Sequence, residues 1–296
     1  MFKILLPSDF SKESENTIRF ASVITRNMSE VKLILFHSIY IHGITPGMLK
    51  QIEDLLINDA SQELNKIKEQ LREKFNGNII PELKIVFGNP VETILDYATE
   101  KKIDLILMSR HTTGRFEKVL MGSNSIDVLK HSKCPVLIVP EDIEINQLYE
   151  IAYATNLENL NEELQEIIPF VKLFKARLTI VHIYPEIVNG ALFDIEKLTE
   201  DTIKHFDYDN INFYFSMNND VKSGVELFIS EYKPSLIVFY TRHRSFWESL
   251  YDQSLTAEFV LNEPVAMLAI PKNIENMSHN DVFSEPHAIT NYSSNT

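Results

Sequence analysis

The chain has 296 residues, of which 44% are hydrophobic and 24% are charged, and its formal net charge is −14. This composition is typical of a soluble globular protein, and the length is enough for two domains. The acidic balance disfavours nucleic acid and anionic membrane as partners, because both carry negative charge. The single cysteine excludes a disulfide framework. No apolar run approaches the ~20 residues that span a bilayer, and no signal-peptide pattern is present, so we expect a cytoplasmic protein.

Short apolar runs alternate with helical patterns along the first half of the chain. The runs at residues 2–6, 31–36, 83–87, 103–108 and 136–139 are typical of strands. A long helix between the second and third runs is indicated by apolar residues from Leu49 to Leu71, at spacings of three, four or multiples of four. Gly88-Asn89-Pro90 then supplies a turn glycine, an N-cap and a first-turn proline. Continuously apolar strands separated by helices favour a parallel sheet that is covered on both faces.

The second half of the chain repeats the pattern of the first. ILLPSDFSKESENTI matches IAYATNLENLNEEL, which places Asp9 opposite Asn156. LILFHS matches LTIVHI, which places His37 opposite His182, and this symmetry favours a structural role for both histidines. The repeat predicts two copies of one domain, at residues 1–143 and 147–272. Residues 273–296 are polar and rich in Asn and Ser, and we expect a flexible tail there.

A candidate ligand site follows from the places where the strands end. In open parallel sheets, ligands bind beyond the carboxyl ends of the strands, at the point where the strand order reverses. The first strand runs into Pro7-Ser8-Asp9 and the fourth into Ser109. If these strands are neighbours, one crevice holds Asp9, the loop from residue 109 and the Gly122-Ser123 turn. A helix that starts near Asn124 would direct its positive end at a phosphate there.

Several motifs together resemble the universal stress protein family. They are PSDFS after the first strand, a histidine at the end of the second, DLILM in the fourth, Gly-Ser before a helix, and CPVLIVP at the domain end. The resemblance covers residues 1–272 and is most specific at 104–140. It implies two Rossmann-like domains of the adenine nucleotide alpha hydrolase type, each a five-stranded parallel sheet with helices on both faces. It also implies that the two domains pair through their last strands as an internal pseudo-dimer.

Some members of this family bind ATP through a G-x2-G-x9-G-[ST] motif. Gly122-Ser123 match its end, whereas Ser109 and Thr112 replace its first two glycines, and Gly114 is a glycine at a shorter spacing. The resemblance implies a nucleotide site made of Pro7, Ser8, Asp9, Ser38, Ser109, Thr112, Gly114, Gly122, Ser123 and Asn124. Asp9 and Ser38 would face the base or ribose, and Gly122, Ser123 and Asn124 the phosphates. The new Cβ atoms hinder a close backbone approach to phosphate, but the new hydroxyls can bind the same oxygens. Both a working site and a turn without ligand are therefore open.

The second half departs further from the family motif. Asn156 replaces the acid, and TRHRSFWESLYDQS stands where the glycines belong, with Ser254 as the remnant of Gly-Ser. We expect no ATP site there. Arg242, His243 and Arg244 form a basic cluster that could hold an anion, although a solvated loop is the simpler interpretation.

The function expected from these features is that of a stress-response binding or regulatory protein with at most one ATP site, in the first half. We expect no enzyme, because no residue is placed as a base for hydrolysis. We expect no dedicated metal site, and Mg²⁺ only where it accompanies the nucleotide. A scaffold that acts through an unidentified protein partner is the alternative, and a weak ATPase is the second. The internal pseudo-dimer is compatible with both a monomer and a homodimer.

Overall fold

The computed structural model describes residues 1–10, 14–26, 28, 30–41, 43, 45–74, 79–109, 123–140, 147–184, 194–240 and 265–271. The strands within these ranges are β1 (Phe2–Pro7), β2 (Val31–Ile39), β3 (Glu82–Phe87), β4 (Leu105–Ser109), β5 (Val136–Val139), β6 (Glu150–Ala154), β7 (Arg177–Tyr184), β8 (Ile211–Met217), β9 (Leu236–Tyr240) and β10 (Ala266–Ile270). The helices are α1 (Ser14–Thr25), α2 (Pro46–Lys74), α3 (Pro90–Lys101), α4 (Ser123–His131), α5 (Leu160–Phe174), α6 (Ile195–Phe206) and α7 (Val221–Tyr232). The expected domain join and the tail from residue 273 lie outside these ranges.

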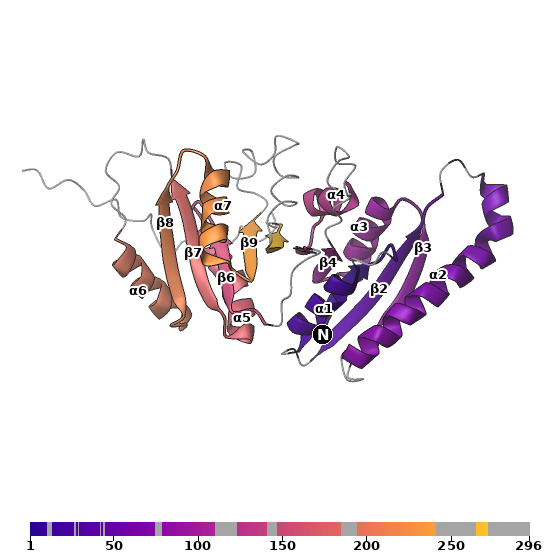
Figure 1. Ribbon diagram of the computed structural model, residues 1–296, viewed down its shortest axis with the longest axis horizontal. Coiled ribbons are helices and arrows are strands. Elements are labelled where there is room, and N and C mark those ends of the chain that lie inside the picture. Colours follow the sequence, from indigo (N-terminus) through magenta and orange to yellow (C-terminus); the bar gives the residue numbers. More distant parts are fainter. Residues whose placement is uncertain are drawn as a thin grey trace, which may run out of the picture.

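All the described strands belong to one sheet (Figure 1). Its order is β3-β2-β1-β4-β5-β10-β9-β6-β7-β8. Each half therefore arranges its five strands in the same way, with the first strand between the second and the fourth. All pairs within each half are parallel. This confirms the predicted fold class of two Rossmann-like units.

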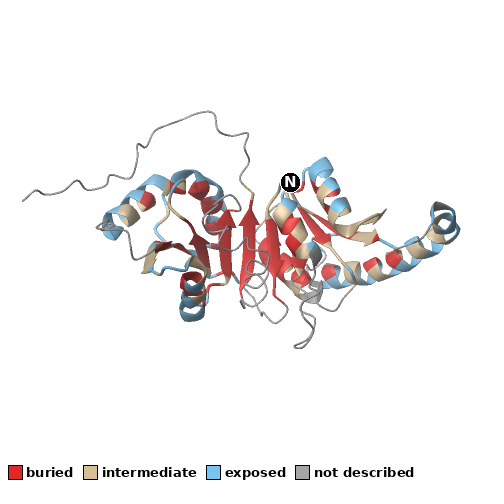
Figure 2. Cartoon of the chain, turned by 90° about the horizontal axis from the view of Figure 1, so that it is seen from above, coloured by how far each residue is buried: buried red, intermediate tan, exposed pale blue. Residues whose placement is uncertain are grey.

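Helices cover both faces of the sheet, and the strands are apolar on both faces for that reason. In β1, Ile4 and Leu6 join the hydrophobic cluster under α1, α2 and α5, whereas Leu5 joins the cluster under α3, α4 and α7. The period of two along the strand assigns neighbouring residues to opposite faces. Figure 2 shows the result as a row of buried central strands between more exposed helices.

The turn from β3 into α3 forms as its sequence predicts. Gly88 has φ +142°, a conformation that L side chains rarely adopt. Asn89 is the N-cap, and its side-chain oxygen accepts hydrogen bonds from the backbone N–H groups of Val91 and Glu92. Pro90 is the first helical residue. The turn fixes α3 against β2, and so supports the carboxyl edge of the first half.

The two halves join through their last strands. β5 and β10 pair antiparallel, with Leu137 opposite Leu268 and Val136 opposite Ala269. Every residue of both strands is buried. The join is therefore a continuous stretch of sheet and core, and it is the pairing that the family resemblance implies.

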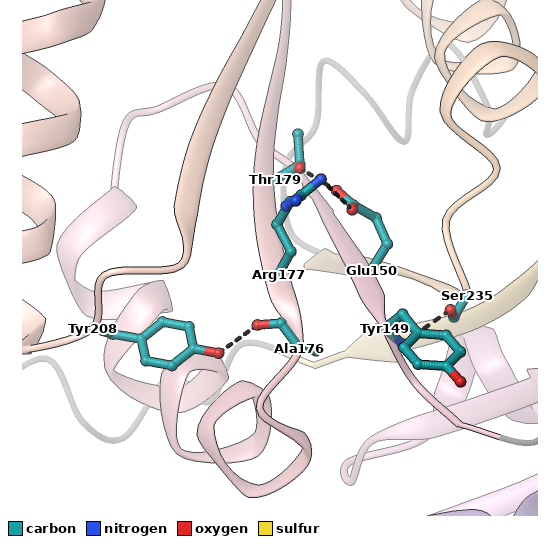
Figure 3. Close-up of polar contacts among 7 residues, drawn as sticks. All are labelled: Tyr149, Glu150, Ala176, Arg177, Thr179, Tyr208 and Ser235. Atoms are coloured by element: carbon teal, nitrogen blue, oxygen red, sulfur yellow. Dashed lines mark hydrogen bonds and ion pairs between the residues drawn. The ribbon is translucent and has the colours of Figure 1, made fainter.

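Polar contacts hold the amino edge of the second half together (Figure 3). Arg177 forms an ion pair with Glu150 at 3.5 Å, and the Thr179 hydroxyl donates to the same carboxylate. The Tyr149 N–H donates to the Ser235 hydroxyl at 3.3 Å, which links β6 to the start of β9. The amino edge of the second half is thus braced by contacts among β6, β7 and the residue that precedes β9.

Candidate functional site

The candidate site lies where the strand order reverses in the first half. β1 pairs with β2 on one side and with β4 on the other, so the carboxyl ends of β1 and β4 meet at the switch point. Pro7 ends β1, and Ser109 ends β4. The Ser125 hydroxyl of α4 donates to the Ser109 carbonyl at 3.2 Å. The first turn of α4 is therefore held against the end of β4, with Asn124 exposed beside it.

Three of the predicted residues fall outside the described part of the chain: Thr112, Gly114 and Gly122. Of the others, Pro7, Ser8 and Asp9 follow one another at the end of β1, and Ser109 and Asn124 lie at the neighbouring strand end and helix start. Ser123 is the first residue of α4. The described geometry thus brings both ends of the predicted crevice together. It leaves the loop between them as a prediction.

Hydrogen bonds fix the turn that carries Asp9. The Ser8 N–H donates to the Phe36 carbonyl at 2.8 Å, which extends the β1–β2 ladder by one residue. The Ser8 hydroxyl accepts from the Phe10 N–H at 3.2 Å, and Phe10 has φ +65°. A side-chain oxygen that binds the backbone two residues ahead makes a tight local turn. Asp9 is consequently held at its tip, with an exposed side chain.

His37 supports the same turn from β2. Its Nδ1–H donates to the Ser8 carbonyl at 2.8 Å, because a carbonyl can only accept. Its ring lies 4.1 Å from the ring of Phe10, measured between centroids, at an interplanar angle of 30°. The histidine therefore positions the Asp9 turn, in agreement with the structural role that the repeat suggests.

Ser38 points to the opposite face of β2, towards α3. Its hydroxyl lies 2.6 Å from the Thr93 hydroxyl, which itself donates to the Asn89 carbonyl at 2.8 Å. Since Thr93 has one proton to donate, Ser38 donates to Thr93 and keeps its own oxygen as an acceptor. An acceptor at this position suits an amine or a hydroxyl of a ligand. The sequence did not indicate the Thr93 contact, because it joins residues from two separate elements.

The second half keeps the same turn without its acid. The Thr155 N–H donates to the Val181 carbonyl at 3.0 Å, and the Thr155 hydroxyl accepts from the Leu157 N–H at 3.0 Å. Leu157 has φ +68°. His182 Nδ1–H donates to the Thr155 carbonyl at 2.9 Å. Burial lowers the pKa of this histidine, which favours the neutral ring. The conserved geometry supports the alignment of the two halves and leaves Asn156 where the first half has Asp9.

Apolar packing fills the second half where the first half has polar groups. Ile183 stands at the position of Ser38, and Gly224 at the position of Thr93. A Cβ atom added to Gly224 would lie 2.7 Å from Cγ2 of Ile183, so the isoleucine lies directly on the glycine. No hydroxyl acceptor remains at this point.

Two tyrosines and two glutamates of the second half form a hydrogen-bonded cluster at α5, in which Tyr153, Tyr240 and Glu163 are buried and Glu166 is exposed. Tyr240 ends β9, as Ser109 ends β4, and its hydroxyl lies 3.1 Å from the Glu163 carbonyl and 2.9 Å from the Glu166 carboxylate. The Tyr153 hydroxyl of β6 donates to the Glu163 carboxylate. Burial, aided by the neighbouring glutamates, raises the pKa of both tyrosines far above the usual range. These four side chains bond to one another or to the backbone of α5, at the end of β9, which is the strand that corresponds to β4 in the first half.

A glutamate at a core position of a helix is the sequence signal for this cluster. Glu163 occupies the apolar face of α5 together with Leu160, Leu164 and Ile167, and only 2% of its surface is exposed. A charged residue at a core position of an amphipathic helix indicates a buried partner.

Two further observations concern the described residues. No group of three or more His, Cys, Asp or Glu side chains among them is arranged to hold a metal ion. None of their helices is long and apolar enough to cross a membrane. The basic cluster at Arg242, His243 and Arg244 lies outside the described ranges.

Comparisons with known proteins agree with this architecture. A sequence model of the Universal stress protein family matches residues 1–140. A universal stress protein of Methanocaldococcus jannaschii is 32% identical over 147 residues, which cover 46% of this chain and 81% of that protein. A second one from the same archaeon is 28% identical over 155 residues, covering 46% of this chain and 93% of that protein.

A solved structure resembles nearly the whole chain. The crystal structure of a universal stress protein from Archaeoglobus fulgidus superposes with a TM-score of 0.72 and 19% identity, covering 92% of this chain and 97% of that one. At 19% sequence identity, this structural similarity supports the same fold and does not indicate a shared function. With helices on both faces of a mostly parallel sheet and a strand order that reverses at β1, the molecule has a Rossmann-like α/β fold. The chain belongs to the universal stress protein family.

Proposed function

We propose that the protein is a cytoplasmic regulatory binding protein that holds one adenine nucleotide in its first half and none in its second. The proposal rests on one observation: the two halves share the same strand order and turn geometry but carry different side chains at the switch point. The first half presents Asp9 and the Ser38 oxygen at the switch point. The second half has Asn156 in place of Asp9 and Ile183 in place of Ser38. Tyr240, which bonds to Glu166, stands where the first half has Ser109.

The chemistry of the first crevice suits ATP. The exposed Asp9 carboxylate can accept from ribose hydroxyls or from the adenine amine. The amino end of α4 is held beside β4. The first N–H groups of a helix have no partner within the helix, and together with the positive dipole end they favour phosphate. Ser109, Thr112, Gly122 and Ser123 complete the proposed phosphate loop. Mg²⁺ would enter only with the nucleotide.

Slow or absent turnover is part of the proposal. A hydrolytic base must lie within hydrogen-bond reach of the attacking water, near the transferred phosphate. Asp9 sits at the strand end where we place the base and ribose, so it is assigned to binding. Binding without turnover fits a protein whose nucleotide occupancy is itself the signal.

Calorimetric titration with ATP tests this function. We expect saturable binding by the wild-type chain and its loss in the Asp9→Ala, Gly122→Ala double variant. The Asn156→Ala variant is the matched control in the second half and should bind as the wild type does. Absence of heat at millimolar ATP would favour the scaffold alternative. Steady phosphate release that the double variant abolishes would favour a weak ATPase.

A further inference from the structure

The amino-terminal half of α2 is not covered by the rest of the described chain. The helix has 29 residues and is therefore about 43 Å long, whereas the nine residues of β2 span roughly 30 Å. The buried residues among those described in the helix are Ala60, at its centre, and Leu64 and Leu71, in its carboxyl-terminal half. Because a helix after a parallel strand runs back along the sheet, the earlier half extends past the carboxyl edge. Figure 1 shows α2 continuing beyond β3.

This uncovered half carries apolar side chains. Met48 is 58% exposed and Leu55 is 60% exposed, and Ile52 and Leu56 are only half-buried. The spacings of three and four residues place Met48, Ile52 and Leu55 on adjoining turns of one face. Such a stripe, on a helix segment that the rest of the described chain leaves uncovered, is typical of a binding surface.

The stripe leads into a pocket of about 430 Å³ beside the Asp9 turn. Its lining includes Phe10, His37, Ile39, Leu56, Asp59 and Glu63. Asp59 and Glu63 are four residues apart, so both carboxylates lie on the same side of α2. Among the described residues of the lining there is no lysine or arginine. The pocket thus combines an apolar wall with two acids at its rim.

The negative charge of this surface favours a basic partner protein over a second copy of this chain. Glu63 forms an ion pair with Lys66 at 2.6 Å, but both side chains are about half exposed or more, and such pairs contribute little. A second copy of this chain would bring its own Asp59 and Glu63 against these carboxylates if it paired through the same face. The chain as a whole carries −14. Like charges oppose self-pairing, whereas a basic partner is attracted and steered to the site.

We propose that the uncovered half of α2 and the adjoining pocket bind a cationic amphipathic helix of a partner protein. The apolar side of the partner packs on Met48, Ile52 and Leu55, in the helix-in-groove manner. A lysine or arginine of the partner enters the pocket, contacts Asp59 and Glu63, and lies over the rings of Phe10 and His37. The same two rings hold the Ser8–Asp9 turn, so the partner binds next to the nucleotide site without forming part of it.

A labelled peptide of repeated Leu-Lys-Lys-Leu-Leu-Lys-Leu heptads is the probe, and fluorescence anisotropy with the full chain measures its binding. The test variant is Asp59→Lys with Glu63→Lys. The matched control is Glu69→Lys with Glu73→Lys, because these two exposed glutamates have the same spacing on the same helix. Glu69 forms an ion pair with Arg72, as Glu63 does with Lys66, so both double variants break one such pair. We expect the test variant to weaken binding at least about tenfold and the control to change it less than about twofold.

A second pair of variants tests the apolar stripe. Leu55→Ser should weaken binding, whereas Leu227→Ser, at a position on α7 that is 55% exposed, should not. Equal losses in both charge variants would overturn the proposal, because they would show general attraction to an acidic protein. Equal binding of a peptide with Glu in place of Lys would overturn it as well. A dimer in sedimentation that Leu55→Ser dissociates would assign the surface to a second copy instead. ATP binding should be unchanged in all four variants, so this test is independent of the nucleotide site.

Discussion

At the residue scale, the buried hydroxyl of Thr17 has no hydrogen-bond partner among the described residues. Thr17 and Thr25 both lie on α1 with 3% of their surface exposed, but the Thr25 hydroxyl donates to the Ala21 carbonyl at 2.8 Å. An unsatisfied buried polar group costs about 1–3 kcal/mol, and replacing it by an apolar group of the same shape removes that cost. Thr17→Val should therefore raise the free energy of unfolding by roughly 1 kcal/mol.

Thr25→Val is the natural control for this prediction, because it removes a made hydrogen bond and leaves the helical bond of Ala21 in place. Urea unfolding of both variants should show Thr17→Val as the more stable one. The opposite order would mean that Thr17 has a partner in solution.

The tyrosine cluster predicts a loss of stability at alkaline pH. The pKa of Tyr153 and of Tyr240 is raised in the folded chain, first by burial and then by the neighbouring glutamates. A tyrosine in the unfolded chain ionises near pH 10. Above that pH the unfolded state binds fewer protons than the folded state, so stability falls as the pH rises. Each tyrosine contributes a slope of up to about 1.4 kcal/mol per pH unit.

Urea midpoints measured between pH 8 and pH 11 test this slope. Tyr153→Phe removes one titrating proton, so its stability should decline less steeply above about pH 10 than that of the wild type. It should also be less stable at neutral pH by about 1–3 kcal/mol, because the Glu163 carboxylate loses a donor. Tyr149→Phe, at a position that is 66% exposed, is the control. An unchanged slope in Tyr153→Phe would contradict the account.

At the element scale, the contact between Gly224 and Ile183 holds α7 against β7. Gly224→Ala places a Cβ atom 2.7 Å from Ile183, and overpacking of this kind costs about 1–3 kcal/mol. Ile183→Ala removes the atoms that clash. The double variant should therefore be more stable than the sum of the two single effects predicts, as a double-mutant cycle from thermal unfolding would show. Additive effects would mean that α7 shifts to accommodate the methyl group.

The elements themselves could largely be predicted from the sequence. The apolar runs predicted the five strands of the first half, and Gly88-Asn89-Pro90 predicted the start of α3, because these signals are local. The Ser38–Thr93 and Tyr240–Glu166 contacts could not be predicted in this way, since each joins elements far apart in the chain. The symmetry of the two histidines predicts a structural role, but their carbonyl partners lie on neighbouring strands, and the sequence alone does not identify them.

At the scale of the whole molecule, the duplication provides a comparison within one chain. Both halves share strand order, turn geometry and histidine support, and they join through β5 and β10. They differ in the groups at the switch point. The first half keeps an acid and a hydroxyl acceptor there, whereas the second half packs isoleucine on glycine and bonds its tyrosines to α5. This contrast is the basis of the proposal that only the first half binds a nucleotide.

The number of ATP molecules bound per chain tests this division most directly. Isothermal titration calorimetry of the purified full chain should give one site per chain, which Asp9→Ala removes and Asn156→Ala leaves intact. Two sites per chain, or one site that survives Asp9→Ala and is lost in Asn156→Ala, would contradict the account. So would the absence of binding at millimolar ATP.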